Sequence, residues 1–247
     1  MQNKKTIALI FAFLVILSVC VYFVFFKARL FIQTTQTPAP EVQTIVVETK
    51  TISEDVSPLK ITVDYPYIAG QEEFNNLAKN LVDKEISDFK TNALENDQAV
   101  KKIDPESYAK YPREYDLIIS YEKGQVDSDL ASVVFEIYKF EGGAHGSSYE
   151  TALNYDFKNK KEITLGDVFA GQENYLQTIS DYCIKDLTNQ ITAAAGNTDG
   201  TWITEGAGPV AENFKIFLIN KDSIIFYFPQ YQVGYGSLGG FKVAMPR

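Results

Sequence analysis

The spacing of apolar residues changes along the chain and separates strand-like from helix-like segments. Every second residue from Leu59 to Tyr65 is apolar or aromatic, which is typical of a strand with one buried face. Between Gln71 and Leu94 apolar residues recur at spacings of three and four, which predicts an amphipathic helix of about six turns. Because such a helix has to bury its apolar stripe, we expect it to pack on the neighbouring strands.

Similar patterns predict further strands on either side of this helix. The strand-like segments of this first half are Thr44–Ile52, Leu59–Tyr67, Tyr115–Glu122, Leu130–Phe140 and Tyr149–Phe157. We expect Lys123, Gly124 and Gln125 to join the third of these strands to the fourth. Three successive strands at such short spacing predict an antiparallel meander.

A second helical region begins at Thr164. Thr164 and Asp167 fit the capping pattern in which a hydroxyl and a carboxylate accept hydrogen bonds from the unpaired N–H groups of a first turn. A buried stripe that includes Cys183 predicts a helix at about 173–192, and a long loop is expected from Ala193 to Ala211. The three strands expected to close the chain are Phe214–Asn220, Ser223–Pro229 and Gly240–Pro246.

The order of these elements predicts an α+β fold. A ββαβββ block is followed by an αβββ block, so we expect a two-part ectodomain in which helices pack on antiparallel sheets. Residues 44–157 are predicted to form the N-terminal α+β half of this ectodomain, and residues 158–247 the C-terminal α+β half.

The segment in front of these halves is predicted to anchor the protein in a membrane. Thr6–Phe26 is an uncharged apolar run of 21 residues; a helix of this length is roughly 31 Å long, close to the hydrocarbon thickness of a bilayer. We expect residues 6–26 to be a single transmembrane helix, residues 1–5 a cytoplasmic tail and residues 27–43 a stalk. The protein would then lie in the cytoplasmic membrane with its C-terminal domain extracytoplasmic.

Charge and cysteine content narrow the classes of partner. The formal net charge is −9, which argues against nucleic acid or an anionic lipid surface, because both are bound through clustered Lys and Arg. Of the two cysteines, Cys20 lies in the apolar run and Cys183 in a predicted helix. We therefore predict that the domain relies on core burial rather than on disulfides.

Three motifs resemble a known family. They are Gly142–Gly146 (GGAHG), Ile163–Phe169 (ITLGDVF) and Tyr227–Tyr231 (YFPQY). With a Trp-containing loop between them, they are similar to the RsiV/PdaC-type extracytoplasmic domain family over Leu59–Arg247. In that family such a domain resembles a lysozyme receptor linked to a sigma-factor inhibitor, or stands before a polysaccharide deacetylase domain. The resemblance implies a bacterial cell-envelope protein with peptidoglycan or a lysozyme-like protein as its partner.

His145 is the only histidine of the chain and lies among glycines. In one interpretation it is a general base or a ligand-contacting residue, on a loop that Gly142 and Gly143 allow to approach a substrate closely. In the other, its imidazole bonds backbone groups and fixes an unusual turn. Ser147 and Ser148 are too close in sequence to His145 to suggest a triad, and one His with one usable Cys cannot supply a zinc site. We predict no catalytic residue, metal or cofactor.

Aromatic residues in the last third of the chain are candidates for ligand contact. Because alternate residues of a strand face opposite sides, Phe226 and Phe228 are assigned to the core. Trp202, Tyr231 and Tyr235 have loop-like surroundings. We expect them on the surface, where Trp and Tyr combine apolar area with a polar handle.

These observations favour a membrane-anchored cell-envelope binding module that is not an enzyme and recognises a glycan or protein ligand outside the cytoplasmic membrane. Its ligand-binding candidates are Gly142, Gly143, His145, Trp202, Tyr231 and Tyr235. The alternative is an envelope hydrolase that acts on peptidoglycan or a related polymer through the His145 loop. A third hypothesis, an assembly role through the transmembrane helix, rests on the small-residue pair Ala8 and Ala12.

Overall fold

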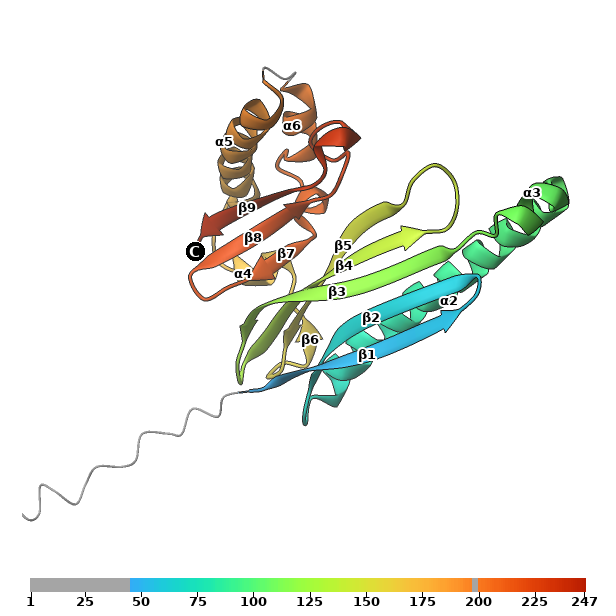
Figure 1. Cartoon of the computed structure of the whole chain (residues 1–247). Coiled ribbons are helices and arrows are strands. Elements are labelled where there is room, and N and C mark those ends of the chain that lie inside the picture. Colours follow the sequence, from blue (N-terminus) through green and yellow to red (C-terminus); the bar gives the residue numbers. More distant parts are fainter. Residues whose placement is uncertain (1–44, 197–199) are drawn as a thin grey trace, which may run out of the picture. The chain divides into compact units, whose positions relative to one another are not determined.

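The computed structural model describes residues 45–196 and 200–247. In this part the chain forms two sheets, each with a helix and a hydrophobic core of its own (Figure 1). The α+β class expected from the order of the elements is confirmed. The predicted tail, transmembrane helix and stalk, residues 1–43, lie outside the described residues. None of the helices in the described ranges combines the length and the apolar content needed to span a bilayer.

The first sheet, sheet A, has six strands in the order β1-β2-β3-β4-β5-β6. Their bounds are β1 Val47–Val56, β2 Leu59–Ile68, β3 Tyr115–Val126, β4 Leu130–Phe140, β5 Ser147–Asp156 and β6 Lys161–Glu162. The predicted antiparallel meander is present as β3, β4 and β5. Strands β2 and β3 are parallel, however, so the expectation of purely antiparallel sheets is wrong for sheet A. The helix between them returns the chain to the same end of the sheet, and such a crossover makes the two strands parallel.

Helix α2, Glu72–Ile103, provides this crossover and covers one face of sheet A (Figure 1). Its apolar stripe is buried as predicted, with Phe74, Val82 and Phe89 each 0% exposed. The stripe packs against the inward-facing residues of the sheet, among them Leu117. Removing these side chains from water stabilises the fold because apolar burial is its main driving force.

The C-terminal end of α2 extends well beyond the predicted end at Leu94. Asp97, on this extension, is 4% exposed and accepts a hydrogen bond at 2.5 Å from the hydroxyl of Tyr108. Tyr108 belongs to a short helix, α3, Pro105–Lys110. The extension is therefore held by a tertiary contact with α3, which the period of the sequence alone does not show.

Residues 123–125, expected to form a turn, lie inside strand β3 instead. The register of the β3–β4 pair shifts in this segment, which marks a β-bulge. The turn follows at Asp127, whose side chain accepts two hydrogen bonds from backbone N–H groups. A Cβ added to Gly124 would lie 2.3 Å from the carbonyl oxygen of Ile219, so the glycine permits a close approach of the second sheet.

The second sheet, sheet B, has three antiparallel strands in the order β7-β8-β9. Their bounds are β7 Phe217–Ile219, β8 Ser223–Phe228 and β9 Phe241–Pro246. Helix α5, Tyr175–Ala195, packs on this sheet over a core that contains Phe226 and Phe228, as predicted. Cys183 of α5 is fully buried in the same core, and its burial raises the pKa of the thiol to about 12.

Short helices connect these elements. They are α4 Leu165–Val168, α6 Thr201–Gly206, η1 Ala211–Phe214 and η2 Gly236–Leu238. The predicted capping box is present, since the side chains of Thr164 and Asp167 each accept from the other's backbone N–H. The segment from Ala193 to Ala211, expected as one long loop, instead contains the end of α5 and all of α6. Helix α6 forms because Ile203, 1% exposed, enters the second core.

A buried polar network joins the two sheets. The Ser132 hydroxyl on β4 donates to the Asn154 side-chain oxygen at 2.5 Å and accepts at 2.7 Å from the backbone N–H of Ile219. The Asn154 amide donates at 3.0 Å to the carbonyl oxygen of Phe217. A small apolar cluster that includes Val134 and Leu218 surrounds this network. Strand β7 is thereby tied to the face of sheet A that α2 does not cover.

Candidate functional site

The loop between β4 and β5 contains the glycines singled out in the sequence. Gly142 and Gly143 have φ angles of 106° and 96°. Residues that carry a Cβ atom rarely adopt such positive φ angles. Asn96 of α2 donates at 2.5 Å to the carbonyl oxygen of Glu141 and lies 2.1 Å from the position of a Cβ on Gly142. Gly142 therefore permits the end of α2 to pack against the base of the loop.

His145 lies exposed in the same loop. Its Nδ1 lies 2.9 Å from the carbonyl oxygen of Gly146. A carbonyl oxygen only accepts hydrogen bonds, so Nδ1 carries the hydrogen, and the neutral ring keeps the lone pair of Nε2 available. Neither Ser147 nor Ser148 is hydrogen-bonded to His145 in the described part of the chain. The loop thus presents an imidazole that can accept a proton at Nε2, without a neighbouring serine nucleophile.

An aromatic ring lies next to His145. A Cβ on Gly146 would overlap the ring of Tyr138, with contacts of 2.5 Å. Tyr138 is 37% exposed and pairs with Ser148 across β4 and β5. A partly exposed tyrosine ring therefore lies against Gly146, the residue that follows His145.

The base of this hairpin is fixed by an ion pair that the sequence did not indicate. Lys139 and Glu85 approach to 2.5 Å, with side chains 10% and 15% exposed. The Tyr149 hydroxyl also donates to Glu85, and burial together with this bond raises the pKa of Tyr149 to about 12. Because the pair joins α2 to β4, it holds the hairpin in place relative to the helix.

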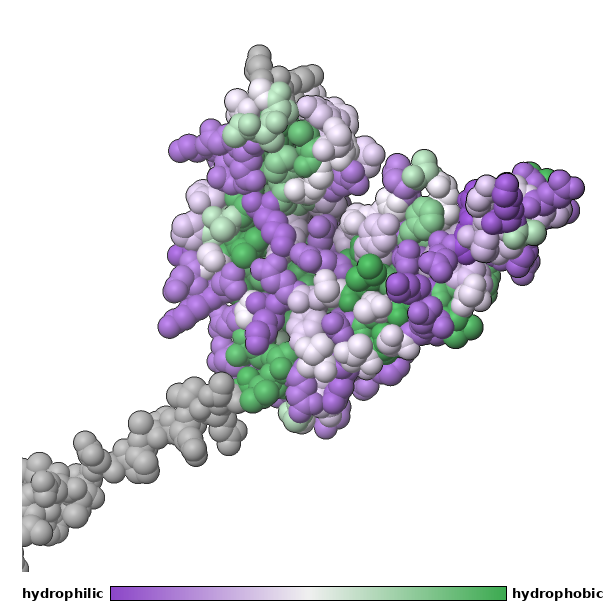
Figure 2. Space-filling model, in the orientation of Figure 1, coloured by the Kyte–Doolittle hydropathy of each residue, from purple (hydrophilic) through white to green (hydrophobic). Residues whose placement is uncertain are grey.

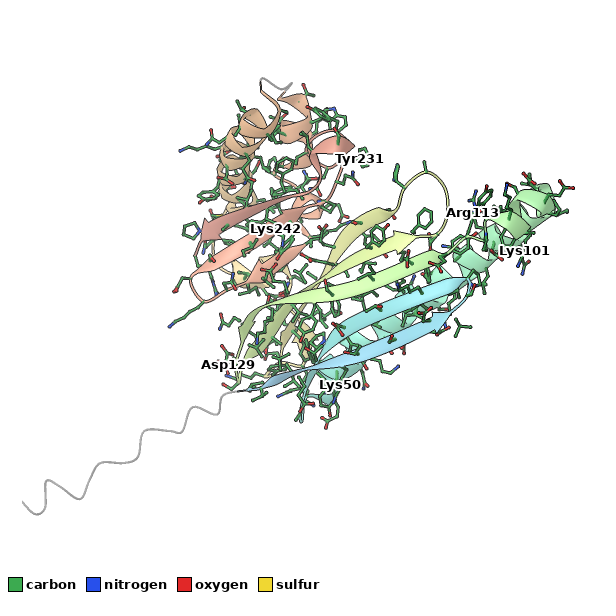
Figure 3. The ribbon with its side chains drawn as sticks, viewed as in Figure 1. Lys50, Lys101, Arg113, Asp129, Tyr231 and Lys242 are labelled. Atoms are coloured by element: carbon green, nitrogen blue, oxygen red, sulfur yellow. The ribbon has the colours of Figure 1, made fainter. Side chains whose placement is uncertain are left out.

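Trp202, Tyr231 and Tyr235 are exposed as expected, by 43%, 61% and 49%. Trp202 lies on α6, whereas Tyr235 and Tyr231, the latter labelled in Figure 3, lie in the connection between β8 and β9. The Gln232 side chain donates at 2.8 Å to the carbonyl oxygen of Gly206, so the tyrosine-bearing loop is bonded to the end of α6. The three aromatic residues therefore belong to one pair of connected loops.

No hydrogen bond, ion pair or ring contact links these three aromatic residues to Gly142, Gly143 or His145 within residues 45–196 and 200–247. The six residues selected from the sequence thus form two groups, one on the hairpin of sheet A and one on the loops above sheet B. Hydrophilic residues cover most of the face shown in Figure 2, and the apolar residues form separate patches.

A charged cluster between the sheets was missed by the sequence analysis. Lys242 lies on β9 (Figure 3), and its ammonium donates to Glu122 at 2.9 Å and to Glu136 at 3.1 Å. The Tyr227 hydroxyl donates to Glu122 at 2.8 Å. Although desolvation acts to raise it, the bonds from Lys242 and Tyr227 lower the pKa of Glu122. Lys242 therefore bridges sheet B to two strands of sheet A.

Glu150 belongs to the same cluster but has no cationic partner of its own. It is paired with Glu136 across β4 and β5, and its Oε2 is buried without a hydrogen bond among the described residues. Burial, and then the charge of Glu136, raise the pKa of Glu150. Only the strand register brings these carboxylates together, so no sequence spacing could have indicated them. No group of three His, Cys, Asp or Glu in the described ranges is arranged to hold a metal ion.

Comparisons with protein families agree with the resemblance seen in the sequence motifs. Residues 52–148 match the family model described as deacetylase PdaC. Residues 166–247 match a family described as a protein of unknown function, DUF3298. The predicted RsiV/PdaC-type resemblance is therefore confirmed: an N-terminal part of the chain is similar to the PdaC family and a C-terminal part to the DUF3298 family.

Two curated relatives are enzymes by name. The chain is 29% identical over 201 residues to the peptidoglycan-N-acetylmuramic acid deacetylase PdaC of Bacillus subtilis, covering 81% of this chain and 40% of the relative. It is 28% identical over 127 residues to the esterase Rv3036c of Mycobacterium tuberculosis, covering 51% of this chain and 53% of the relative. The chain thus spans about half or less of the length of these relatives.

Solved structures of the DUF3298 family share the fold. One from Bacteroides fragilis has a TM-score of 0.52 at 18% identity, and one from Pseudomonas aeruginosa has 0.53 at 12%. Each match covers 82% of this chain and 90% of the solved chain. At these identities the likeness establishes the fold alone.

The relatives correct the function expected from the sequence. A non-catalytic binding module was predicted, with no enzymatic activity, but both curated relatives are named as enzymes, a deacetylase and an esterase. The prediction was wrong because it required a complete catalytic constellation of familiar type. The alternative, an envelope hydrolase, agrees better with the relatives.

Proposed function

We propose that this chain, a PdaC domain followed by a DUF3298 domain, is a cell-envelope hydrolase that removes acyl groups from peptidoglycan. The observation on which the proposal rests is that one relative is a deacetylase of N-acetylmuramic acid in peptidoglycan and the other is an esterase. Both names describe hydrolysis at an acyl carbonyl, of an amide in the first case and of an ester in the second. Acyl transfer to water is therefore the reaction class that they share.

His145 is the residue of the described chain best suited to activate the water. Its Nδ1 hydrogen is engaged with the Gly146 carbonyl, so Nε2 can take a proton from water as the oxygen attacks the acyl carbonyl. The resulting imidazolium returns this proton to the leaving amine or alcohol when the tetrahedral intermediate collapses. The acyl group leaves as the carboxylic acid, and the ring returns to its neutral form.

The backbone of the same loop supports the proposed reaction. Within the described residues, the N–H groups of Gly143 and Ala144 donate to no acceptor. Donors that are free in the unliganded loop can bind the negative charge that develops on the acyl oxygen. Glycine at position 143 adds no side chain that would prevent the approach of this oxygen.

The exposed aromatic residues Trp202, Tyr231 and Tyr235 are proposed to hold the polymer. Sugar rings pack on the faces of Trp and Tyr, and the three side chains lie on α6 and on the β8–β9 connection, which are bonded to each other. Anchoring through residues 6–26, an extracytoplasmic location and the division into halves at residues 157 and 158 remain part of this proposal. A lysozyme-like protein partner also remains a prediction.

Acetate release tests the proposed function. The full chain is incubated with purified peptidoglycan and, separately, with an aryl acetate, and free acetate is quantified. We expect His145→Gln to lower the rate at least about a hundredfold, the usual minimum contribution of a general base. Ser128→Ala, an exposed turn substitution far along the chain from the loop, should not change it. No acetate from either substrate, or equal rates for the His145 variant and the unmodified protein, would refute the proposal.

A further inference from the structure

A pocket of about 380 Å³ opens where α2, α3 and the segment before β3 meet. Ile103, Tyr108, Tyr111 and Arg113 contribute to its walls. Ile103 and Tyr111 are 83% and 65% exposed, so the pocket presents apolar and aromatic surface to solvent. The sequence motifs give no indication of this site, because its residues come together only through the extension of α2.

Arg113 is the cation of this pocket that has no partner in the described chain. Lys101 pairs with Asp97 at 3.3 Å, and Asp104 accepts at 3.0 Å from the backbone N–H of Ser107 at the start of α3. The carboxylates of Asp97 and Asp104 are thus engaged with other groups. An arginine fork binds a carboxylate through two parallel hydrogen bonds, so Arg113 is suited to an anionic group of this shape.

Two tyrosine rings lie beside this arginine. Lys101 lies over the Tyr108 ring at 4.7 Å, and Lys110 lies over the Tyr111 ring at 5.1 Å. Tyr108 is fixed further by its hydrogen bond to Asp97. Tyr108 is the fixed ring and Tyr111 the exposed one. Together they offer a surface on which a sugar can stack, and the fixed ring loses little side-chain entropy when the sugar binds.

The pocket is connected to the loop that contains His145. Asn96, on α2 before the pocket, donates to the carbonyl oxygen of Glu141. Tyr115, two residues after Arg113, is 0% exposed, and its ring would lie 3.4 Å from a Cβ on Gly142. Figure 3 shows Lys101 and Arg113 at the same end of sheet A as the β4–β5 loop. Asn96 and Tyr115 therefore link the elements around the pocket to the base of the His145 loop.

We propose that this pocket binds a carboxylate-bearing part of peptidoglycan, with Arg113 paired to the carboxylate and Tyr108 and Tyr111 against the adjoining sugar or peptide. The carboxylate comes either from the lactyl ether of muramic acid or from the end of a stem peptide. This inference rests on the proposed function for its choice of polymer. It assigns substrate recognition to a site separate from the hydrolytic loop.

Binding to three small probes distinguishes the two sources of the carboxylate. The full chain is titrated with N-acetylmuramic acid, with N-acetylglucosamine, which lacks the lactyl carboxylate, and with the dipeptide D-Ala-D-Ala. Preference for the first probe assigns the lactyl group, and preference for the dipeptide assigns the stem peptide. Equal binding of N-acetylmuramic acid and N-acetylglucosamine, without binding of the dipeptide, would overturn the proposal.

Substitutions locate the binding and separate it from hydrolysis. Arg113→Gln should lower the affinity for the preferred probe at least about tenfold, because a bidentate charged pair is lost. Arg247 lies outside this pocket, so the Arg247→Gln variant should bind the probe as the unmodified protein does. On peptidoglycan, Arg113→Gln should raise KM and leave kcat nearly unchanged. His145→Gln should keep probe binding. If no acetate is released but probe binding depends on Arg113, the proposed function fails and this inference stands. If probe binding is unchanged in Arg113→Gln, this inference fails and the proposed function is unaffected.

Discussion

Replacement of Asn154 by alanine tests the polar network between the sheets. Asn154 is 5% exposed and its partner Ser132 is 0% exposed. The side chain accepts from the Ser132 hydroxyl and donates to the carbonyl oxygen of Phe217. Asn154→Ala therefore leaves one donor and one acceptor without partners in a place that water does not reach.

The expected loss of stability follows from these two groups. Each buried polar group left without a partner costs about 1–3 kcal/mol, so we expect the free energy of unfolding to fall by about 2–6 kcal/mol for the two groups. This is a large share of the roughly 5–15 kcal/mol of a typical domain. Ser132→Ala should cost a comparable amount, because it removes the acceptor of the Ile219 N–H.

Urea unfolding, followed by circular dichroism, measures the effect. Asn80→Ala is the matched control, because Asn80 is exposed on α2 and the change should alter stability by no more than about 0.5 kcal/mol. The double variant, with Ser132→Ala and Asn154→Ala combined, should lose less free energy of unfolding than the sum of the losses in the two single variants, since both residues belong to one network. A loss for Asn154→Ala equal to that of the control, or full additivity, would show that the network does not stabilise the junction.

Two further predictions concern the same junction. Gly124→Val should lower the urea midpoint, because its Cβ alone would lie 2.3 Å from the Ile219 carbonyl oxygen. Gly200→Val is the control, because Gly200 has open space around it and a φ of −65°. The raised pKa of Glu150 means that its charged form is disfavoured in the fold. The resulting penalty is absent below the unfolded pKa, near 4.5, and complete above the folded pKa. Glu150→Gln should therefore raise the urea midpoint at pH 7 but not at pH 4, and equal shifts at both would contradict the assignment.

Local patterns predicted much of the fold. The three- and four-residue spacing before Leu94 predicted α2, and the alternation around Phe226 and Phe228 predicted that these two residues enter the core. These features are set by residues near each other in the chain. The α2 extension depends on a bond from Tyr108 to Asp97, a tertiary contact that has no local signature.

The candidate sites depended even more on tertiary contacts. Gly142 and His145 were identified from a short motif and do occupy one loop. Arg113, by contrast, has no unusual sequence context, and its pocket lies where α3 packs against the end of α2 through the bond from Tyr108 to Asp97. The expectation that 123–125 form a turn failed for a similar reason, since glycine was needed there for the contact with β7.

Strand β1 has a consequence for copies of the protein at high local concentration. It is the outermost strand of sheet A, with one row of backbone N–H and C=O groups unpaired by any strand in the described chain. Such an edge can recruit a strand from a neighbouring molecule and begin aggregation. Glu48, Lys50 and Asp55 are exposed along β1, and two molecules pairing edge to edge would have to bring these charges together. The same strand that completes the sheet thereby helps to keep neighbouring molecules apart.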